Sequence, residues 1–169
     1  SFSLRRQGIL LHCLSDRLQD DEDSVKEEAM TCLKKVAPLF PSGCEEILRR
    51  ELRDTRKDHR GNAFEALKLA SREWPEVGCL HLDELIREEE GDLRIRGSMI
   101  LRTIASKGGA EAWDLIGWSL QDEEVRVRRN AAKTLTVLAD VEPRVAVILV
   151  ESSIGEDDRQ IRGSVIKAL

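Results

Sequence analysis

The stretch LQDEEVRVRRNAAKTL, residues 120–135, decides the fold. Its apolar residues recur every three or four positions after a short acidic turn, which predicts an amphipathic helix. The same arrangement returns at a spacing of 34 residues along the chain. Three columns of this repeat are apolar in all five copies: Leu14, Leu48, Leu82, Ile116 and Val150; Leu18, Leu52, Ile86, Leu120 and Ile154; and Leu33, Leu67, Leu101, Leu135 and Leu169. A repeat of this length predicts an all-α array of stacked helix pairs.

Proline marks the start of most copies. Pro41, Pro75 and Pro143 share one phase, and Gly109 holds the equivalent place. Proline is tolerated in the first turn of a helix, where its missing N–H would have no partner. The predicted array has five antiparallel helix pairs, with repeats at about 7–40, 41–74, 75–108, 109–142 and 143–169. Since the last repeat stops early, we expect the chain to be part of a longer array.

Each repeat is predicted to contain two helices. The first helices are expected at about 7–18, 42–53, 76–87, 110–120 and 144–154. The second helices are expected at about 24–37, 58–71, 92–105, 125–139 and 159–169. Small residues share one phase of the second helices and should let the paired helix approach closely: Ala29, Ala63, Gly97 and Ala131.

The pattern Leu-x-Asp-x(4)-Val-Arg-x-x-Ala-x(3)-Leu of residues 120–135 resembles a HEAT-type repeat, in particular the short HEAT-like repeats of the phycobilin-lyase type. The resemblance covers essentially the whole chain and implies an α-solenoid whose second helices line a concave face. A tetratricopeptide array is disfavoured because its Trp, Leu-Gly and Tyr pattern is absent. The family includes scaffolds, transport factors, lyase subunits and DNA-repair proteins, so the fold alone does not name a function.

The resemblance also implies a structural role for about half of the conspicuous arginines. In HEAT-type repeats, the turn acid and the arginine after the aliphatic position commonly bond along the stack. The matching residues form the expected structural ladder: Asp20, Asp54, Asp122, Arg60, Arg94, Arg128 and Arg162, with Glu88 and Glu156 as further turn acids and Lys26 in place of an arginine. Charge-assisted hydrogen bonds of this kind would join neighbouring repeats.

Composition excludes several classes of protein. The net charge of −5 argues against a generic nucleic-acid binder, and no apolar run approaches the ~18 residues that span a bilayer. The four cysteines show no metal-ligand spacing and fall beside apolar columns: Cys13, Cys32, Cys44 and Cys79. We therefore predict buried, reduced thiols and a reducing, cytoplasmic compartment.

No set of residues argues for a reaction. His12, His59 and His81 lie in different phases, and none belongs to an HxxxH or His-Glu pair. There is no nucleophile motif and no glycine-rich phosphate loop with GK[ST]. We predict no catalytic residue, no metal and no cofactor, and we expect no small-molecule ligand.

Charge is unevenly distributed between the two sets of helices. In the five second helices Lys and Arg outnumber Asp and Glu, although the whole chain is acidic. Apart from the ladder arginines, these cations are expected to face outward along the concave surface: Lys34, Lys68, Arg96, Arg102, Arg129, Lys133 and Lys167. They favour a protein-interaction scaffold that binds an acidic segment. The alternatives are a solvated face whose cations pair with the acidic turns, and nucleic-acid binding of the DNA-repair type.

A single tryptophan suggests a second contact. Trp118 occupies a phase that is polar in the other copies, so we expect it to be exposed on a first helix, as a candidate contact on the convex side. A lyase-type subunit that handles a tetrapyrrole has no support beyond the family resemblance.

Overall fold

The chain folds into α-helices, which confirms the predicted all-α class. The computed structural model describes residues 2–169, and this range contains eleven helices and no strand. It divides into two compact units, Ser1–Val77 and Gly78–Leu169. The boundary lies close to the predicted junction between the second and third repeats, and the single continuous array stays a prediction.

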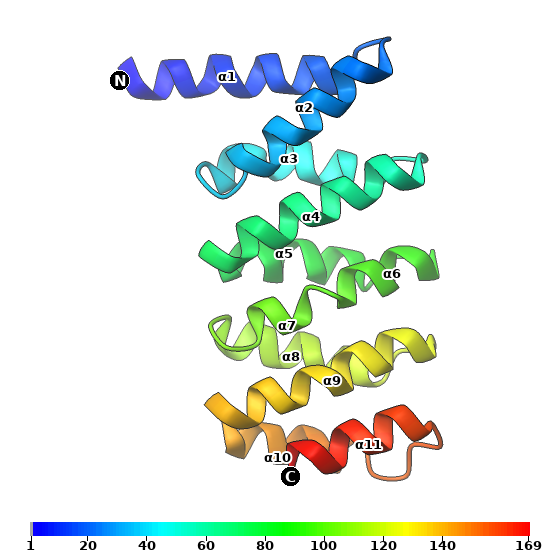
Figure 1. Ribbon diagram of the computed structural model, residues 1–169. Coiled ribbons are helices and arrows are strands. Elements are labelled where there is room, and N and C mark those ends of the chain that lie inside the picture. Colours follow the sequence, from blue (N-terminus) through cyan, green and yellow to red (C-terminus); the bar gives the residue numbers. More distant parts are fainter. Residues whose placement is uncertain (1) are drawn as a thin grey trace. The chain divides into compact units, whose positions relative to one another are not determined.

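The first unit consists of two helix pairs. α1 (Phe2–Leu18) and α2 (Asp23–Val36) form the first pair, and α3 (Pro41–Glu51) and α4 (Lys57–Glu73) form the second (Figure 1). α2 packs against α1 and α4, and α4 also packs against α3. The predicted apolar columns supply the core, and each of these residues is at most 4% exposed: Leu14, Leu18, Leu33, Leu48, Leu52 and Leu67.

The second unit is organised around one long helix. Its elements are α5 (Pro75–Leu85, which begins in the first unit), α6 (Gly91–Ser98), α7 (Leu101–Ile104), α8 (Gly109–Leu120), α9 (Val125–Val141), α10 (Pro143–Glu151) and α11 (Arg159–Ala168). α9 packs against α6, α7, α8, α10 and α11. The column residues Leu82, Leu101, Ile116, Leu135 and Val150 are buried. Three column members differ: Ile86 is partly exposed, Ile154 is 73% exposed and Leu169 is 77% exposed.

In several helix pairs, an acidic side chain stabilises the turn between the two helices. The Oδ1 atoms of Asp20, Asp54 and Asp122 accept the backbone N–H two residues further on, at 3.1, 2.8 and 2.8 Å respectively. Such bonds favour a tight turn, so the chain enters the second helix in a defined direction. At the other junctions, Pro41 and Pro143 lie in the first turn of α3 and α10, where the repeat phase predicted a helix start.

The third repeat differs from the continuous helix predicted over residues 92–105. The helix ends at Ser98 and resumes at Leu101, so α6 and α7 replace it (Figure 1). The N–H groups of Met99 and Ile100 bond to carbonyls three residues back, at 3.1 and 2.9 Å. The hydroxyl of Ser98 donates to the carbonyl of Ile95 at 2.7 Å. Hydrogen bonds to carbonyls three residues back wind the backbone more tightly than in an α-helix, so the helix is interrupted here. The spacing of the apolar residues did not predict this interruption.

Other boundaries also differ from the prediction. α1 begins at Phe2 rather than near residue 7, and α10 ends at Glu151 rather than near residue 154. Boundaries are the least specific part of a periodic pattern, because hydrogen bonds at helix ends depend on the neighbouring turn.

Gly108, which precedes α8, has no room for a side chain. A Cβ atom there would lie 2.6 Å from the Cβ of Ala112 and 2.9 Å from the carbonyl oxygen of Ile104. We expect Gly108→Ala to lower the free energy of unfolding by about 1–3 kcal/mol, because backbone atoms must move. Urea denaturation would measure this loss.

Gly117→Ala is the matched control for this change. The new Cβ would meet only the flexible Cδ2 of Leu149, at 3.3 Å. Replacing glycine in a helix interior also lowers the conformational entropy of the unfolded chain, so the control should be neutral or stabilising. Equal stability of the two variants would show that the crowding at Gly108 is absent.

Candidate partner-binding surface

The predicted outward cations lie in both units. Lys34 and Lys68 belong to α2 and α4 of the first unit. The other five belong to the second unit: Arg96 on α6, Arg102 on α7, Arg129 and Lys133 on α9, and Lys167 on α11. One ribbon across all seven stays a prediction, and each unit has its own cationic surface.

Both cations of the first unit contact polar neighbours. The Nζ atom of Lys34 donates to the Oδ1 of Asn62 on α4 at 2.7 Å. The Nζ atom of Lys68 lies 3.6 Å from the carboxylate of Glu65, one turn earlier on the same helix. The carboxylate of Glu65 offsets the charge of Lys68, whereas Asn62 is neutral and holds the ammonium group of Lys34 in place without reducing its charge.

Two of the five cations in the second unit are held in ion pairs. Arg96 bonds to Asp92 on its own helix at 3.1 Å. Arg129 on α9 bonds to Asp158, the residue before α11, at 2.6 Å. The hydrogen bond from Arg129 lowers the pKa of Asp158 from 3.8 to about 2, so this pair stays charged at neutral pH. Arg96 and Arg129 therefore have structural partners, and the bond of Arg129 to Asp158 fits the alternative in which these cations pair with the acidic turns.

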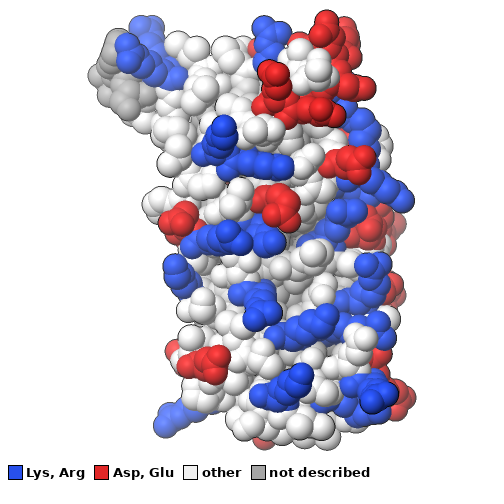
Figure 2. Space-filling view, in the orientation of Figure 1, with Lys and Arg blue, Asp and Glu red and all other residues white. Residues whose placement is uncertain are grey.

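The other three of these five predicted cations are exposed and have no carboxylate partner among residues 2–169. They are Arg102 on α7, Lys133 on α9 and Lys167 on α11. α9 packs against both α7 and α11, so the three side chains lie on neighbouring helices. Figure 2 shows Lys and Arg side chains gathered over these helices. We call Arg102, Lys133 and Lys167 the cationic triad.

The helices around the cationic triad carry almost no negative charge. Residues 93–110, 125–139 and 159–169 contain neither Asp nor Glu. By contrast, α2 and α4 of the first unit contain acidic residues such as Glu28 and Glu65. The positive potential of the triad is therefore not cancelled within its own helices.

Three arginines of the second unit make the same contact with their own turns. An Nη1 atom donates to two carbonyls five and six residues earlier in Arg94, Arg128 and Arg162. Arg94 also reaches the next acidic turn, with its Nε atom 3.2 Å from Asp122. Arg128 likewise reaches Glu156, at 2.9 Å. Arg94 and Arg128 therefore make the expected ladder pairs with acidic residues of the next turn.

The remaining ladder positions have other surroundings. Asp20 bonds to Arg17, and Asp54 bonds to Arg56 at 2.8 Å. The hydrogen bond from Arg56 lowers the pKa of Asp54 from 3.8 to about 2. Arg60 is buried on α4. The bonds to Arg17 and Arg56 arise from local chain geometry, which the repeat pattern does not encode.

The first unit contains a buried polar cluster that the sequence did not indicate. Glu51 at the end of α3 is 1% exposed, and its Oε2 atom lies 2.5 Å from the Nε2 of His59 on α4. Asp54 completes a group whose ligand atoms all lie within 4.8 Å of one another. Glu51 also accepts from Arg50 at 2.7 Å. Because Arg50 and Arg56 already neutralise the two carboxylates, a divalent ion would lie beside two guanidinium groups, and we assign no metal chemistry.

The predicted exposure of Trp118 is confirmed. This side chain on α8 is 54% exposed, and the guanidinium of Arg87 lies 5.5 Å from the centre of its ring. A cation in this position stabilises the tryptophan conformation by about 0.5–1 kcal/mol. Contact with a partner stays a prediction.

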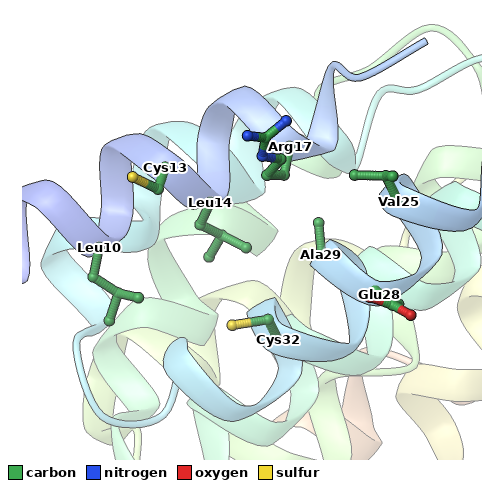
Figure 3. Close-up of a pocket in the computed structure, with 8 residues that line it drawn as sticks. All are labelled: Leu10, Cys13, Leu14, Arg17, Val25, Glu28, Ala29 and Cys32. Atoms are coloured by element: carbon green, nitrogen blue, oxygen red, sulfur yellow. The ribbon is translucent and has the colours of Figure 1, made fainter. Parts of the chain in front are cut away.

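The prediction of four buried thiols is only half correct. Cys44 and Cys79 are buried, whereas Cys32 is partly exposed and Cys13 is exposed on α1. Figure 3 shows that Cys13 and Cys32 line a groove between α1 and α2. All four are free thiols. Of the helices described, none combines the length and apolarity that a membrane crossing requires.

Comparisons with known proteins define the fold but no activity. No family model and no curated protein matches the chain. Among solved structures, the chain is similar to the crystal structure of an engineered protein, a target of the Northeast Structural Genomics Consortium. The two share 17% identity and a TM-score of 0.55, over 94% of this chain and 77% of that chain. Similarity at this identity supports the helical fold alone.

Proposed function

We propose that the chain is a HEAT-like α-solenoid that serves as a non-enzymatic protein-interaction scaffold, and that its second unit binds an acidic segment of a partner. The observation that carries this proposal is the cationic triad on segments that contain no Asp or Glu, residues 93–110, 125–139 and 159–169. The repeated contacts of Arg94 and Arg128 support the solenoid part, because equivalent residues join consecutive turns in the same way.

The spacing of the triad suits an extended peptide. Packed helices lie about 8–10 Å apart, so Arg102, Lys133 and Lys167 should follow one another at roughly this interval. A chain in the extended polyproline II conformation advances about 3.1 Å per residue and presents every third side chain on the same face, so an acidic side chain at every third residue would meet successive cations. The expected partner segment therefore carries Asp or Glu with a period of about three residues.

A protein segment is favoured over nucleic acid by the composition of the same helices. Residues 93–110, 125–139 and 159–169 contain no Phe, Tyr, Trp or His, so they offer no side chain on which a base could stack. The acidic remainder of the chain would also repel a long polyanion. A short acidic peptide avoids this repulsion because it covers only the triad.

The binding test compares two triple variants of the full chain. Fluorescence anisotropy would follow a labelled peptide with Glu at every third residue. Arg102→Glu, Lys133→Glu and Lys167→Glu together should weaken binding at least roughly tenfold, since each exposed pair contributes about 0.5–1 kcal/mol. Added salt should weaken wild-type binding as well, because exposed charges are screened.

The matched control changes net charge by the same amount at other exposed cations. It combines Lys57→Glu, Arg72→Glu and Arg144→Glu. Lys57 and Arg72 lie on α4 and Arg144 lies on α10, helices that carry none of the triad residues. This control should bind the peptide almost as tightly as the wild type. An equal loss in both variants, or no peptide binding at low salt, would disprove the proposal. Tighter binding of an oligonucleotide than of the peptide would favour the nucleic-acid alternative instead.

A further inference from the structure

The exposed side chain of Trp118 is restrained by its neighbours in the second unit. Its ring lies 5.5 Å from the guanidinium of Arg87, two residues after the end of α5. Arg87 is fixed in turn by Asp83, because its Nη2 atom lies 2.7 Å from the carboxylate and its Nε atom donates to the Asp83 carbonyl at 3.1 Å. A side chain that is already ordered loses little conformational entropy when a partner covers it. Trp118 is therefore suited to anchor a partner.

The indole N–H of Trp118 is available to a ligand, because it has no acceptor among residues 2–169. By contrast, the other exposed tryptophan, Trp74, donates its indole N–H to the carbonyl of Pro38 at 2.9 Å. Trp118 thus combines a ring that is 54% exposed with an unused donor. This combination of apolar area and a polar group makes tryptophan frequent at the centre of binding surfaces.

Acidic side chains share the face of α8 that carries Trp118. Glu111 and Asp114 precede Trp118 by seven and four residues, a spacing that aligns all three along one side of a helix. Both carboxylates are exposed and have no cationic partner among the described residues. Residues 108–125 contain neither Lys nor Arg. The face therefore has an apolar anchor at one end and uncompensated negative charge at the other.

The neighbouring helices add apolar side chains to this face. Leu80 on α5 and Ile148 on α10 lie 34 residues before and after Asp114, and they are 41% and 64% exposed. α8 and α10 are adjacent, since a Cβ atom at Gly117 would lie 3.3 Å from the Cδ2 of Leu149. The repeat position of Asp114 is exposed on α5, α8 and α10 alike, so its exposure is a property of the repeat.

We infer that this face is a second docking surface, for an amphipathic helix of a partner that carries an apolar residue and Lys or Arg one and two turns away. We call it the Trp118 face: Leu80, Glu111, Asp114, Trp118 and Ile148. Charge complementarity selects this partner, because basic side chains neutralise the two carboxylates, whereas an acidic segment suited to the cationic triad would be repelled here. The Trp118 face thus goes beyond the proposed function and does not depend on it.

The register of such a contact defines the probe. In an antiparallel helix pair, residues four and seven positions after the one that covers Trp118 would lie opposite Asp114 and Glu111. The probe is therefore a labelled alanine-rich peptide of about 20 residues, with Leu at one position and Lys four and seven positions later. Fluorescence anisotropy with the full chain should detect its binding at low salt. Replacing both Lys by Gln should weaken binding roughly tenfold, since two exposed ion pairs are lost.

Trp118→Ala should weaken binding of this peptide roughly thirtyfold, because a central tryptophan contributes much of the binding free energy. Met99→Ala is the matched control. Met99 is also apolar and 59% exposed, but it lies in the turn between α6 and α7. This control should bind like the wild type, and circular dichroism should show the same helix content in both variants.

Glu111→Gln together with Asp114→Asn should weaken binding roughly tenfold and remove most of its salt dependence. The matched control combines Asp140→Asn and Glu142→Gln, two exposed acids at the end of α9 and in the turn before α10. No binding of the peptide at low salt would overturn the inference. An equal loss in a variant and its matched control would overturn it as well.

The triad variant separates this surface from the proposed function. Arg102→Glu, Lys133→Glu and Lys167→Glu together should not weaken binding of the basic peptide, even though they abolish binding of the acidic one. Sedimentation velocity of the wild type and of this variant tests a second copy of the chain as the occupant. Self-association that the triad variant loses would mean that the triad of another copy covers the Trp118 face, and the assignment to a separate basic helix would be wrong.

Discussion

Arg94→Ala should lower the free energy of unfolding by about 3–5 kcal/mol, the cost of breaking a buried ion pair from one side. The Arg94 side chain is 9% exposed, and that of its partner Asp122 is 10% exposed. The same guanidinium donates to the carbonyls of Glu88 and Glu89 at 2.8 and 3.0 Å. Alanine would leave all of these acceptors without their donor. Because a whole domain is stable by only about 5–15 kcal/mol, thermal and urea unfolding should show the loss clearly.

Arg96→Ala is the control for Arg94→Ala. Arg96 is two positions away, but its side chain is 31% exposed and pairs with Asp92 one turn earlier on the same helix. Such an exposed pair contributes about 0.3–0.5 kcal/mol. If the two variants were equally stable, the ion pair between Arg94 and Asp122 would contribute nothing to the free energy of unfolding. The structural ladder would then have no stabilising role at this position.

His59→Leu should lower the free energy of unfolding by about 3 kcal/mol, because it removes a partner from a buried carboxylate. The Oε2 atom of Glu51 contacts His59 at 2.5 Å, in a position that water hardly reaches. Leucine offers this oxygen no hydrogen bond. Urea denaturation of the single variant would measure the effect.

The double variant Glu51→Leu with His59→Leu should recover most of that stability. The third repeat has Leu85 and Leu93 at the equivalent positions, and both are buried. An apolar pair of suitable volume often replaces a buried polar pair without loss. A double variant less stable than the single one would mean that Glu51 has a further role at this site.

The two candidate surfaces differ in how far the sequence could predict them. The positive charge around Arg102, Lys133 and Lys167 was evident from the segments 93–110, 125–139 and 159–169, which contain no acidic residue. The lack of partners at these three residues was not, because Arg96 and Arg129 look identical in the pattern and yet are paired.

The exposure of Trp118 was predicted because its phase is polar in the other copies, whereas its contact with Arg87 depends on how α5 and α8 pack.

The sequence by itself determined the helical class, the order of helices and most of the buried columns. The reason is physical: an apolar stripe must be buried, and a fixed period repeats the same stripe in every copy. Only the tertiary structure decided which charges are paired, where Glu51 meets His59, and where the third repeat breaks at Ser98. These features depend on contacts between helices, and a periodic pattern assigns the same environment to every copy.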